Sequence, residues 1–340
     1  MRFIYSADIH ATGYLQDKII KESNLPERLD SIKNVLHQMS DYARLENINS
    51  IIFGGDLLHN KSIIYTDALN LLLDYFRENK DLTYYLIDGN HDLSSKGEYS
   101  TSALKSLESE INIVRYKEAT KISGDQILLV PYSNNMIKDI KNNSCEYLIS
   151  HFGLNEGTLN SGVSLVADLG INDLKGKYKF VYLGHYHSPQ EIITKEIEIY
   201  YVGSPIQRDW GEKGETKRFL VVDTNTKKTL SVPTTGYKEY HELKITQDNK
   251  DEVIKQATKL KESGHEIKLV KSEIFDTTDI KDFKLVEKIE RDITNRGINS
   301  SMSTEEKILK YIQIKNIPED KIEKYKRVGM EIISRVYGEK

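Results

Sequence analysis

Short apolar runs alternate with amphipathic stretches through the first 235 residues of this 340-residue chain. The runs RFIYSAD, SIIFGGD and TYYLIDGNH have the length and the β-branched and aromatic content of strands. Between them, residues 26–46 and 64–79 carry apolar side chains at helical spacing. This order of strand, helix, strand, helix, strand predicts a parallel sheet whose connections are helices.

Fewer helices separate the later apolar runs, which are ILLVPY, YLISH, FVYLGH, IYYVGS and RFLVVD. Such a change favours a second sheet that is stacked on the first. We therefore predict an α/β (α+β) fold in which two stacked mixed β-sheets are flanked by helices. This domain is expected to span residues 1–237.

The texture of the sequence changes near Tyr240, where lysine and glutamate become dense. A strand, helix, strand, helix pattern predicts a small βαβα capping module over residues 238–300. Residues 301–340 predict a C-terminal helical pair, since Ser303 and Glu306 have capping-box spacing and Pro318 suits the first turn of a second helix.

The helical pair carries apolar residues at helical spacing on both of its helices. They are Ile308, Leu309 and Ile312 on the first helix, and Ile322, Tyr325, Val328, Ile332, Ile333 and Val336 on the second. Two short helices cannot bury two such faces entirely against each other, so one stripe remains for another surface. That surface is either the protein's own domain or a partner.

Composition limits the class of protein. A hydrophobic content of 38% with 29% charged residues is typical of a globular protein, and no apolar run of 18 residues exists that could cross a membrane. The first ten residues, MRFIYSADIH, lack the apolar core and cleavage site of a secretory signal, which predicts a cytoplasmic protein. The single cysteine, Cys145, excludes an intramolecular disulfide and a cysteine-based metal cluster, so any metal must be bound by His, Asp, Glu or Asn.

Residues of the metal-binding kind stand at the ends of the apolar runs. They are Asp8, His10, Asp56, Asn90, His91, His151, His185 and His187. Five of the nine histidines in the sequence are in this set. A core in which histidines are only satisfied by hydrogen bonds would not repeat this placement, and His37, His241 and His265 lie outside it.

The spacing of these residues predicts two metal ions. In an extended backbone, the patterns D-x-H and H-x-H place two side chains on the same face, so each pair can chelate one ion. Apart from His91 the set holds seven possible ligands, which are too many for one ion. Imidazole and carboxylate suit manganese, iron or zinc, and a carboxylate-bridged pair of ions about 3.5 to 4 Å apart is a common device for phosphoester displacement. The bridge is predicted to be Asp56, because the two preceding glycines carry no crowding side chains.

The motifs DIH, GGD, GNHD, SHF and GHYH follow one another between residues 8 and 187. This ordered set resembles the calcineurin-like metallophosphoesterase superfamily, whose pattern is D-x-H, G-D, G-N-H-[DE], H and G-H-x-H. Protein phosphatases of that superfamily follow the second motif with a phosphate-binding arginine, whereas this sequence has GGDLLHNK. The difference resembles the SbcD or Mre-eleven type of DNA repair nuclease.

Two further stretches resemble the same branch, namely ERLDSIKNVL and YYVGSPIQRDWGEKGETKRFLVVD. The compact length is similar to that of the phage form, the small subunit of the T-even recombination endonuclease. One departure is DIHATG, where the family usually has Leu-Gly after the histidine. The loop that shapes the path of the DNA is therefore expected to differ.

The resemblance implies a role for each site residue. One metal would be held by Asp8, His10, Asp56 and His187, and the other by Asp56, Asn90, His151 and His185. Both are expected to be divalent ions, manganese first and magnesium as the alternative.

Three further residues receive roles beside the metals. His91 would be the catalytic residue, orienting the phosphate or protonating the leaving oxygen. Asp92 is expected to support the site without touching metal, by holding the turn or the other nitrogen of His91. By resemblance His59 contacts the substrate phosphate, and the alternative is a surface histidine at a helix start.

The resemblance further implies a dinuclear-metal DNA nuclease, exo- or endonucleolytic, that acts in recombination and double-strand-break repair. Its partners would be DNA, an SMC-like ATPase subunit of the SbcC type and a second copy of the protein, in the cytoplasm or, for a phage protein, the host cytoplasm. The alternatives are a phosphodiesterase or phosphatase for a small ester and a mainly structural subunit. The last 100 residues favour the nuclease, since a small-ester enzyme needs neither a charged module nor a helical pair.

Overall fold

The computed structural model describes residues 1–14, 17–95, 100–158, 167–271, 275, 280, 282–287, 302–315 and 317–337. Within the helices, the side chains of Thr304 and of residues 332–337 lie outside the description. By the density of internal contacts the protein falls into two compact units. The first comprises Met1–Glu242 with Thr258–Ile267, and the second Leu243–Ala257 with Lys268–Lys340.

The first sheet of unit one has a parallel centre with an antiparallel side. Its strands, in spatial order, are β14 (Lys228–Pro233), β13 (Arg218–Asp223), β1 (Arg2–Ser6), β4 (Ser50–Gly54), β5 (Thr83–Ile87) and β6 (Ile113–Tyr116). Strands β1, β4, β5 and β6 run parallel, while β13 pairs with β1 in the antiparallel sense. The carboxyl ends of β1, β4 and β5 therefore meet at one edge of the sheet.

The second sheet repeats this plan with a parallel centre and antiparallel outer strands. Its strands, in spatial order, are β11 (Gln190–Ile193), β12 (Glu198–Tyr201), β10 (Phe180–Gly184), β9 (Tyr147–His151), β8 (Ile127–Val130) and β7 (Thr120–Ile122). Strands β9 and β10 are neighbours in register, so that Gly184 lies opposite His151.

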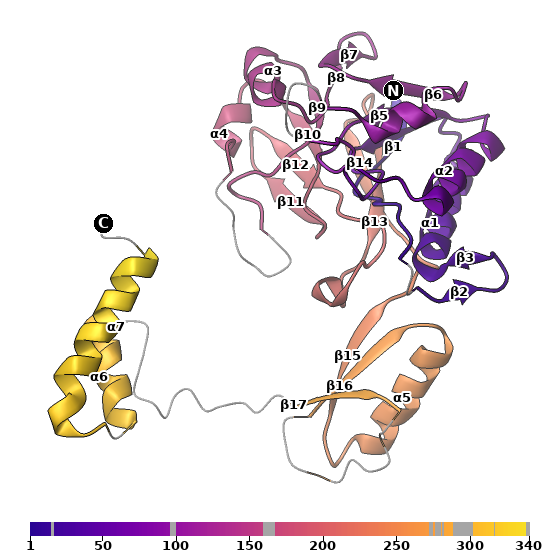
Figure 1. The fold of residues 1–340 in the computed structure, drawn as a ribbon. Coiled ribbons are helices and arrows are strands. Elements are labelled where there is room, and N and C mark those ends of the chain that lie inside the picture. The colour runs from indigo at the N-terminus through magenta and orange to yellow at the C-terminus, as the bar shows by residue number, and fades with distance from the viewer. Residues whose placement is uncertain are drawn as a thin grey trace. The chain divides into compact units, whose positions relative to one another are not determined.

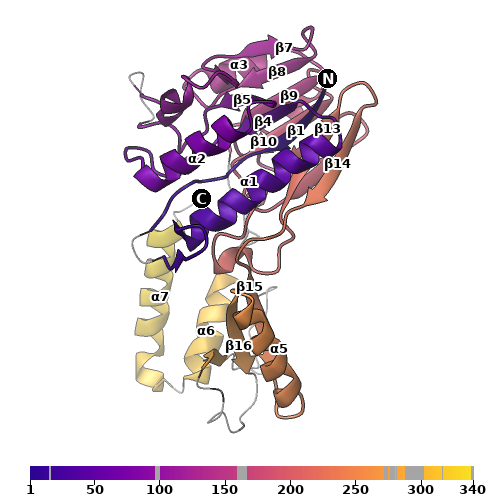
Figure 2. The ribbon, with the colours of Figure 1, turned by 90° about the vertical axis from the view of Figure 1, so that its right-hand side faces the viewer.

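The two sheets stack face to face, and helices cover their outer faces (Figures 1 and 2). The layer between the sheets is filled by apolar side chains from both, among them Phe3, Ile52, Ile149 and Tyr182. Helices α1 (Glu27–Leu45) and α2 (Thr66–Glu78) pack on the first sheet through a second core. Helices α3 (Met136–Asn142) and α4 (Ile171–Leu174) contribute to a third core on the second sheet. The predicted fold of two stacked mixed sheets flanked by helices is therefore confirmed.

Minor elements complete unit one. They are β2 (Ile19–Ile20), β3 (Leu25–Pro26) and the 3-10 helices Ala103–Leu107 and Trp210–Glu212. None of the helices in the described ranges combines the length and apolar content that a membrane crossing requires.

The segment after residue 238 begins with a small sheet of order β15 (Tyr240–Ile245), β16 (Glu266–Lys271) and β17 (Lys284–Glu287). Helix α5 (Lys250–Glu262) connects the first two strands, and β17 is parallel to β16. The strand, helix and strand at the start of the predicted βαβα pattern are present, and a third strand follows. Residues 288–300, where the second helix was expected, lie outside the described residues.

Helices α6 (Thr304–Ile314) and α7 (Ile322–Tyr337) form the predicted C-terminal pair and pack side by side, joined through a 3-10 turn at Glu319–Lys321 (Figure 1). The capping box is present, since the hydroxyl of Ser303 accepts from the Glu306 amide at 3.2 Å and the Glu306 carboxylate accepts from the Ser303 amide at 2.6 Å. The domain boundaries at 237 and 300 stay predictions.

Candidate metal centre

The loops after β1 and β4 run side by side at the edge of the first sheet. The amide of Asp8 donates to the Gly55 carbonyl at 3.0 Å, and the amide of His10 donates to the Asp56 carbonyl at 2.9 Å. Asp8, His10 and Asp56 all have left-handed backbone conformations, with φ of 56°, 49° and 54°. Such conformations are costly for residues other than glycine, so the surrounding structure must impose them.

Two glycines let these loops approach closely. A Cβ on Gly55, which has φ of +96°, would lie 2.5 Å from Nδ1 of His151. A Cβ on Gly89 would lie 2.2 Å from Oδ1 of Asp56. The space beside the Asp56 carboxylate thus comes from Gly89, while Gly55 makes room for His151.

One group of possible ligands is formed by Asp8, His10 and His187, whose donor atoms lie within 4.8 Å of one another. The Nε2 atoms of His10 and His187 are 3.2 Å apart, and they lie 3.8 Å and 3.9 Å from Oδ1 of Asp8. Two imidazoles and a carboxylate converging in this way are the ligands that borderline divalent metals prefer.

A second group is formed by Asp8, Asp56 and His151. The Nε2 atom of His151 lies 3.2 Å from Oδ2 of Asp56 and 3.9 Å from Oδ1 of Asp8. Beside this group, Oδ1 of Asn90 and Nδ1 of His185 are 3.0 Å apart. The backbone amide of His185 donates to the Asp8 carboxylate at 2.9 Å, which ties the second sheet to the first.

Asp8 belongs to both groups, and the carboxylate of Asp56 also lies beside a histidine of each. Its Oδ2 atom lies 3.6 Å from Nε2 of His10 and 3.2 Å from Nε2 of His151. Its other oxygen, Oδ1, accepts a hydrogen bond from the amide of His91 at 2.7 Å. This is the position that a bridging carboxylate would occupy in a dinuclear centre.

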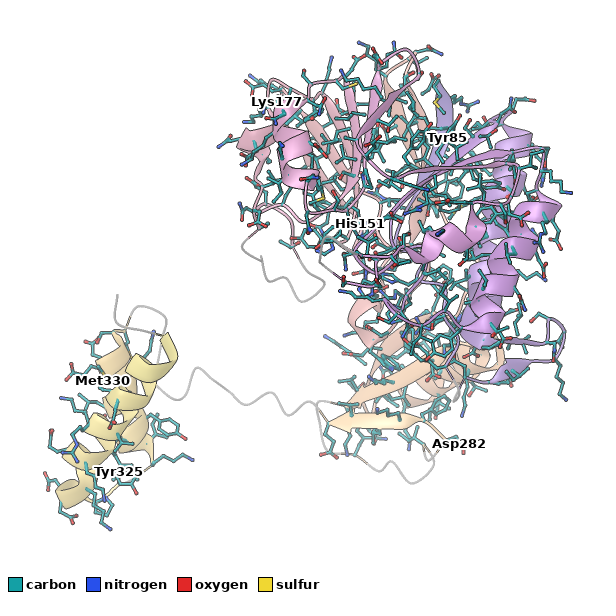
Figure 3. All side chains as sticks on the ribbon, turned by 45° about the horizontal axis from the view of Figure 1, so that its top comes forward. Tyr85, His151, Lys177, Asp282, Tyr325 and Met330 are labelled. Atoms are coloured by element: carbon teal, nitrogen blue, oxygen red, sulfur yellow. The ribbon has the colours of Figure 1, made fainter. Side chains whose placement is uncertain are left out.

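The surroundings of His151 indicate whether these residues could bind a metal ion. Its Nδ1 donates to the Gly54 carbonyl at 2.9 Å, which directs the Nε2 lone pair toward the two carboxylates. His151, labelled in Figure 3, is completely buried, and its Nε2 atom has no hydrogen-bond partner. An unpartnered imidazole nitrogen between two buried carboxylates fits a cation, so the residues form a candidate dimetal site.

The charges of the protein itself agree with a cation at this place. Burial by itself disfavours a charged imidazole, but the carboxylates of Asp56 and Asp8 outweigh it and raise the pKa of His151 to about 10. Burial raises the pKa of Asp56, but the charge of His151 and hydrogen bonds outweigh that and lower it to about 2. Without metal, a proton on His151 supplies the positive charge that the carboxylates require.

His59 and His91 lie next to His10. Nδ1 of His91 donates to the His59 carbonyl at 2.6 Å, and the two rings stack with centroids 5.4 Å apart. Nδ1 of His59 lies 3.1 Å from Nδ1 of His10, and burial together with the charge of Arg208 lowers the pKa of His59 to about 4. The structure therefore places His59 against the candidate centre, where its imidazole is uncharged at neutral pH.

Asp92 is completely buried. Among the described residues, its carboxylate accepts hydrogen bonds only from backbone amides. Its Oδ2 accepts from the amides of Asp56 at 2.7 Å and Gly89 at 2.9 Å, and its Oδ1 accepts from the amide of Leu58 at 2.9 Å. It thus joins the loop that carries Asp56 to the loop that carries Asn90 and His91. The alternative expectation was that Asp92 would hold a ring nitrogen of His91. Nδ1 of His91 donates to the carbonyl of His59 instead.

Three residues near His187 were not singled out in the sequence. Oε1 of Glu212 lies 3.4 Å from Nδ1 of His187, and Oε2 of Glu212 pairs at 2.7 Å with the fully buried Lys217. The guanidinium of Arg208 lies 3.0 Å from His187. A signal was available, because the charged stretch QRDWGEKGETKR interrupts two apolar strands, but nothing in its spacing pairs it with a histidine.

The histidines outside the sequence pattern lie elsewhere in unit one. His37 pairs with Glu78 at 3.8 Å. His241 and His265 form a group with Glu239, but Nδ1 of His265 accepts a hydrogen bond from the Glu239 amide at 3.1 Å. That bond occupies the lone pair of Nδ1 and leaves the proton of the neutral ring on Nε2, so His265 has no free ligand atom.

Residues 1–189 match the family described as calcineurin-like phosphoesterase. Among curated proteins, the sequence is 22% identical over 300 residues to a subunit of the nuclease SbcCD of Staphylococcus epidermidis, covering 78% of this protein and 77% of that one. It is 25% identical over 227 residues to exonuclease subunit 1 of phage T4, covering 63% of this protein and 64% of that one. Among solved structures, an archaeal phosphodiesterase is 14% identical with a TM-score of 0.37, covering 69% of this protein and 100% of that one.

Proposed function

The protein belongs to the calcineurin-like phosphoesterase family, and from this premise we propose that it is a two-metal DNA nuclease that hydrolyses phosphodiester bonds. Family membership and the candidate dimetal site make it a phosphoesterase hydrolase. The observation that carries the two-metal proposal is the position of the Asp56 carboxylate, whose Oδ2 atom lies within 3.6 Å of His10 and within 3.2 Å of His151.

We assign the ligands by their neighbours. One ion would be held by Asp8, His10, Asp56 and His187, and the other by Asp56, Asn90, His151 and His185. The closeness of Asp8, His10 and His187, of Asp56 and His151, and of Asn90 and His185 supports this division. The mixture of imidazole and carboxylate favours manganese, with magnesium as the alternative. When bound, the ions supply charge that polarises the phosphate and lowers the pKa of water.

The residues of the protein perform the remaining steps. His91 would protonate the leaving oxygen from Nε2, because its Nδ1 is engaged by the His59 carbonyl and fixes the direction of the ring. His59, held against His10, would contact the phosphate. Asp92 would keep the loops of Asp56 and His91 at their mutual distance through its three backbone hydrogen bonds.

Two features support DNA as the substrate rather than a small ester. Two of the curated relatives are named as nuclease or exonuclease subunits. The protein also continues beyond the matched residues 1–189 into a lysine-rich segment and a helical pair. We propose that residues 238–300 direct DNA to the metals, since α5 alone carries Lys250, Lys255, Lys259 and Lys261.

We further propose that residues 301–340 bind an SMC-like ATPase subunit of the SbcC type, and that the active complex contains two copies of this protein. The Staphylococcus epidermidis relative is named as one subunit of a complex, the nuclease SbcCD. Helix-in-groove contacts at the spacing of the apolar residues on α6 and α7 are a common docking mode.

A direct assay tests the nuclease proposal. The purified protein is incubated with manganese or magnesium and with linear or circular single-stranded DNA, linear duplex DNA and a chromogenic phosphodiester. Manganese-dependent cleavage of DNA that is absent from Asp56→Asn is expected. Cleavage of the chromogenic ester without cleavage of any DNA, also in the presence of the ATPase, would favour a small-ester phosphodiesterase. No cleavage of either substrate would favour a structural subunit.

A further inference from the structure

Arg208 lies in the connection between β12 and β13, and its guanidinium reaches the candidate metal centre. Nη1 lies 3.0 Å from each ring nitrogen of His187, and Nη2 lies 3.3 Å from Nδ1 of His59. Two residues that are far apart in the sequence, one a proposed metal ligand and the other a proposed phosphate contact, thus share one guanidinium group.

No carboxylate accepts a hydrogen bond from this guanidinium among the residues that the structure describes. The Nε atom of Arg208 is buried without a hydrogen-bond partner. The nearby Glu212 accepts instead from the backbone amide of Arg208 at 3.1 Å, and its carboxylate is occupied by Lys217 and the hydroxyl of Ser204. A partly buried guanidinium whose side-chain contacts are imidazoles and not a hydrogen-bonded carboxylate can still accept an anion from outside the protein.

Two metal ions bound at the candidate centre would favour such an anion. Two divalent ions carry more positive charge than the carboxylates of Asp8 and Asp56 can neutralise. Arg208 adds a further positive charge beside His187 and therefore repels the ions unless a negative group lies between them. A phosphodiester has this charge, and its two free oxygens match the planar fork of a guanidinium.

The backbone of Arg208 is held in place without any substrate. Its carbonyl accepts from Nη2 of Arg28 at 2.8 Å and from the hydroxyl of Tyr240 at 3.2 Å. The side chain of Gln207 donates to the Glu215 carbonyl at 3.0 Å and accepts from the Tyr240 amide at 2.8 Å. Such support from both sides is typical of a residue that is preorganised for a ligand.

We propose that Arg208 is a substrate-binding residue that holds the free oxygens of the scissile phosphate beside the metal ions. The inference rests on the proposed function in that the substrate is a phosphodiester. It does not require that the phosphodiester belong to DNA. The competing role is a structural one, in which Arg208 only positions the ring of His187.

The test compares Arg208→Ala, Arg208→Lys and a matched control, Arg218→Lys. Arg218 is a largely buried arginine on β13 whose guanidinium pairs with Glu191 at 2.6 Å. The measurements are metal content by elemental analysis, thermal unfolding, affinity of the calcium-loaded protein for inorganic phosphate and for a DNA oligonucleotide, and kcat/KM with DNA and a chromogenic phosphodiester in manganese.

Arg208→Ala is expected to keep two metal ions and to bind both phosphate and DNA about 10- to 10²-fold more weakly, the usual cost of one charge-assisted hydrogen-bonding group. The salt dependence of DNA binding should lose about one phosphate contact. Arg208→Lys should recover part of the affinity, since it restores the charge without the fork. Arg218→Lys should bind phosphate and DNA as the wild type does.

Two outcomes would overturn the proposal. Unchanged affinity for phosphate in both Arg208 variants would exclude contact with the anion. If Arg208→Lys lost a metal ion, and its phosphate affinity fell only in proportion to the lost metal content, Arg208 would have the structural role. If the wild-type protein bound phosphate and cleaved the chromogenic ester but no DNA, the nuclease proposal would be refuted. The proposal for Arg208 would still hold.

Discussion

The candidate metal centre and the C-terminal helical pair are built in opposite ways. At the centre, side chains from the ends of several strands converge, and Asp8, Asp56 and His151 are almost completely buried. In the helical pair the contacts are local, and large apolar side chains stay exposed, with Tyr311 at 49% and Tyr325 at 50%.

This difference indicates which interactions stabilise each region. The centre confines two carboxylates and several imidazoles in a small buried volume, which is costly until cations are present. The helical pair buries Ile312 but leaves Val328 and Met330 on its surface, so it can gain energy from another apolar surface. The centre is therefore expected to fail through single substitutions, and the helical pair through loss of docking. The following changes test this contrast, beginning with the largest effect on turnover.

Asp56→Asn is expected to abolish turnover more completely than a change of any other single ligand. One oxygen of its carboxylate lies closer to both His10 and His151 than the Asp8 carboxylate does, so both ions should be disturbed. The loss should exceed the ~10²- to 10⁴-fold cost of a missing general acid. Near-normal activity in a variant that still holds two ions would refute the bridge.

His91→Ala is expected to lower the rate by ~10²- to 10⁴-fold while the metal content stays at two ions. The ring is anchored at Nδ1 by the His59 carbonyl, which leaves Nε2 for the substrate. Single-turnover cleavage and elemental analysis of the same sample measure both quantities. If one ion were lost, His91 would be a ligand rather than an acid.

Metal binding should release a proton from His151. Its pKa of about 10 in the metal-free protein means that the ring is protonated at pH 7, and ligation requires the neutral ring. Because the proton competes with the metal below that pKa, affinity for the ion should rise by about tenfold per pH unit from pH 7 toward pH 9. Calorimetry in buffers of different ionisation enthalpy counts the protons released.

The same shift acts on the metal-free fold in the opposite direction. A raised pKa stabilises the folded state at low pH, and this contribution is lost as the pH rises through about 10. Added metal should therefore raise the melting temperature more at pH 9 than at pH 7. A shift that is equal at both values would show that His151 is already neutral without metal.

Truncation after Ser300 is expected to have the smallest effect on chemistry. Cleavage of a chromogenic phosphodiester and the content of metal should be unchanged, because the proposed ligands all lie in unit one. Co-purification with the ATPase should be lost. A sharper pair of variants is Tyr325→Asp, which places a charge on the exposed apolar face, and Lys324→Asp as its control. Unchanged co-purification of the truncated protein would refute the docking assignment.

Much of the candidate metal centre could be predicted, because the ends of strands can be recognised in the sequence. Apolar runs that stop at Asp8, Asp56, His151 and His185 indicate parallel strands whose ends share an edge. The helices around them follow from apolar spacing, and α1 begins within one residue of the predicted start. Such features are local, so periodicity and motif order are sufficient to find them.

The contributions of Glu212, Lys217 and Arg208 were not predictable in this way. Each lies in a connecting segment without periodicity, and its role depends on contact with His187 or His59. The second helix expected after β17 and the side chains of Ile332, Ile333 and Val336 fall outside the described residues, so those predictions stay untested.

The sequence by itself determined the succession of strands along the chain in unit one, the residue types at the candidate metal centre and the capping of α6, because these depend on residues close together in the sequence. Only the tertiary structure decided that Asp92 holds two loops, that Gly89 makes the space beside Asp56, and that the guanidinium of Arg208 lies beside His187 and His59. The physical reason is that hydrogen bonds, close approaches and buried charges depend on distances between segments, which arise only when the two sheets stack.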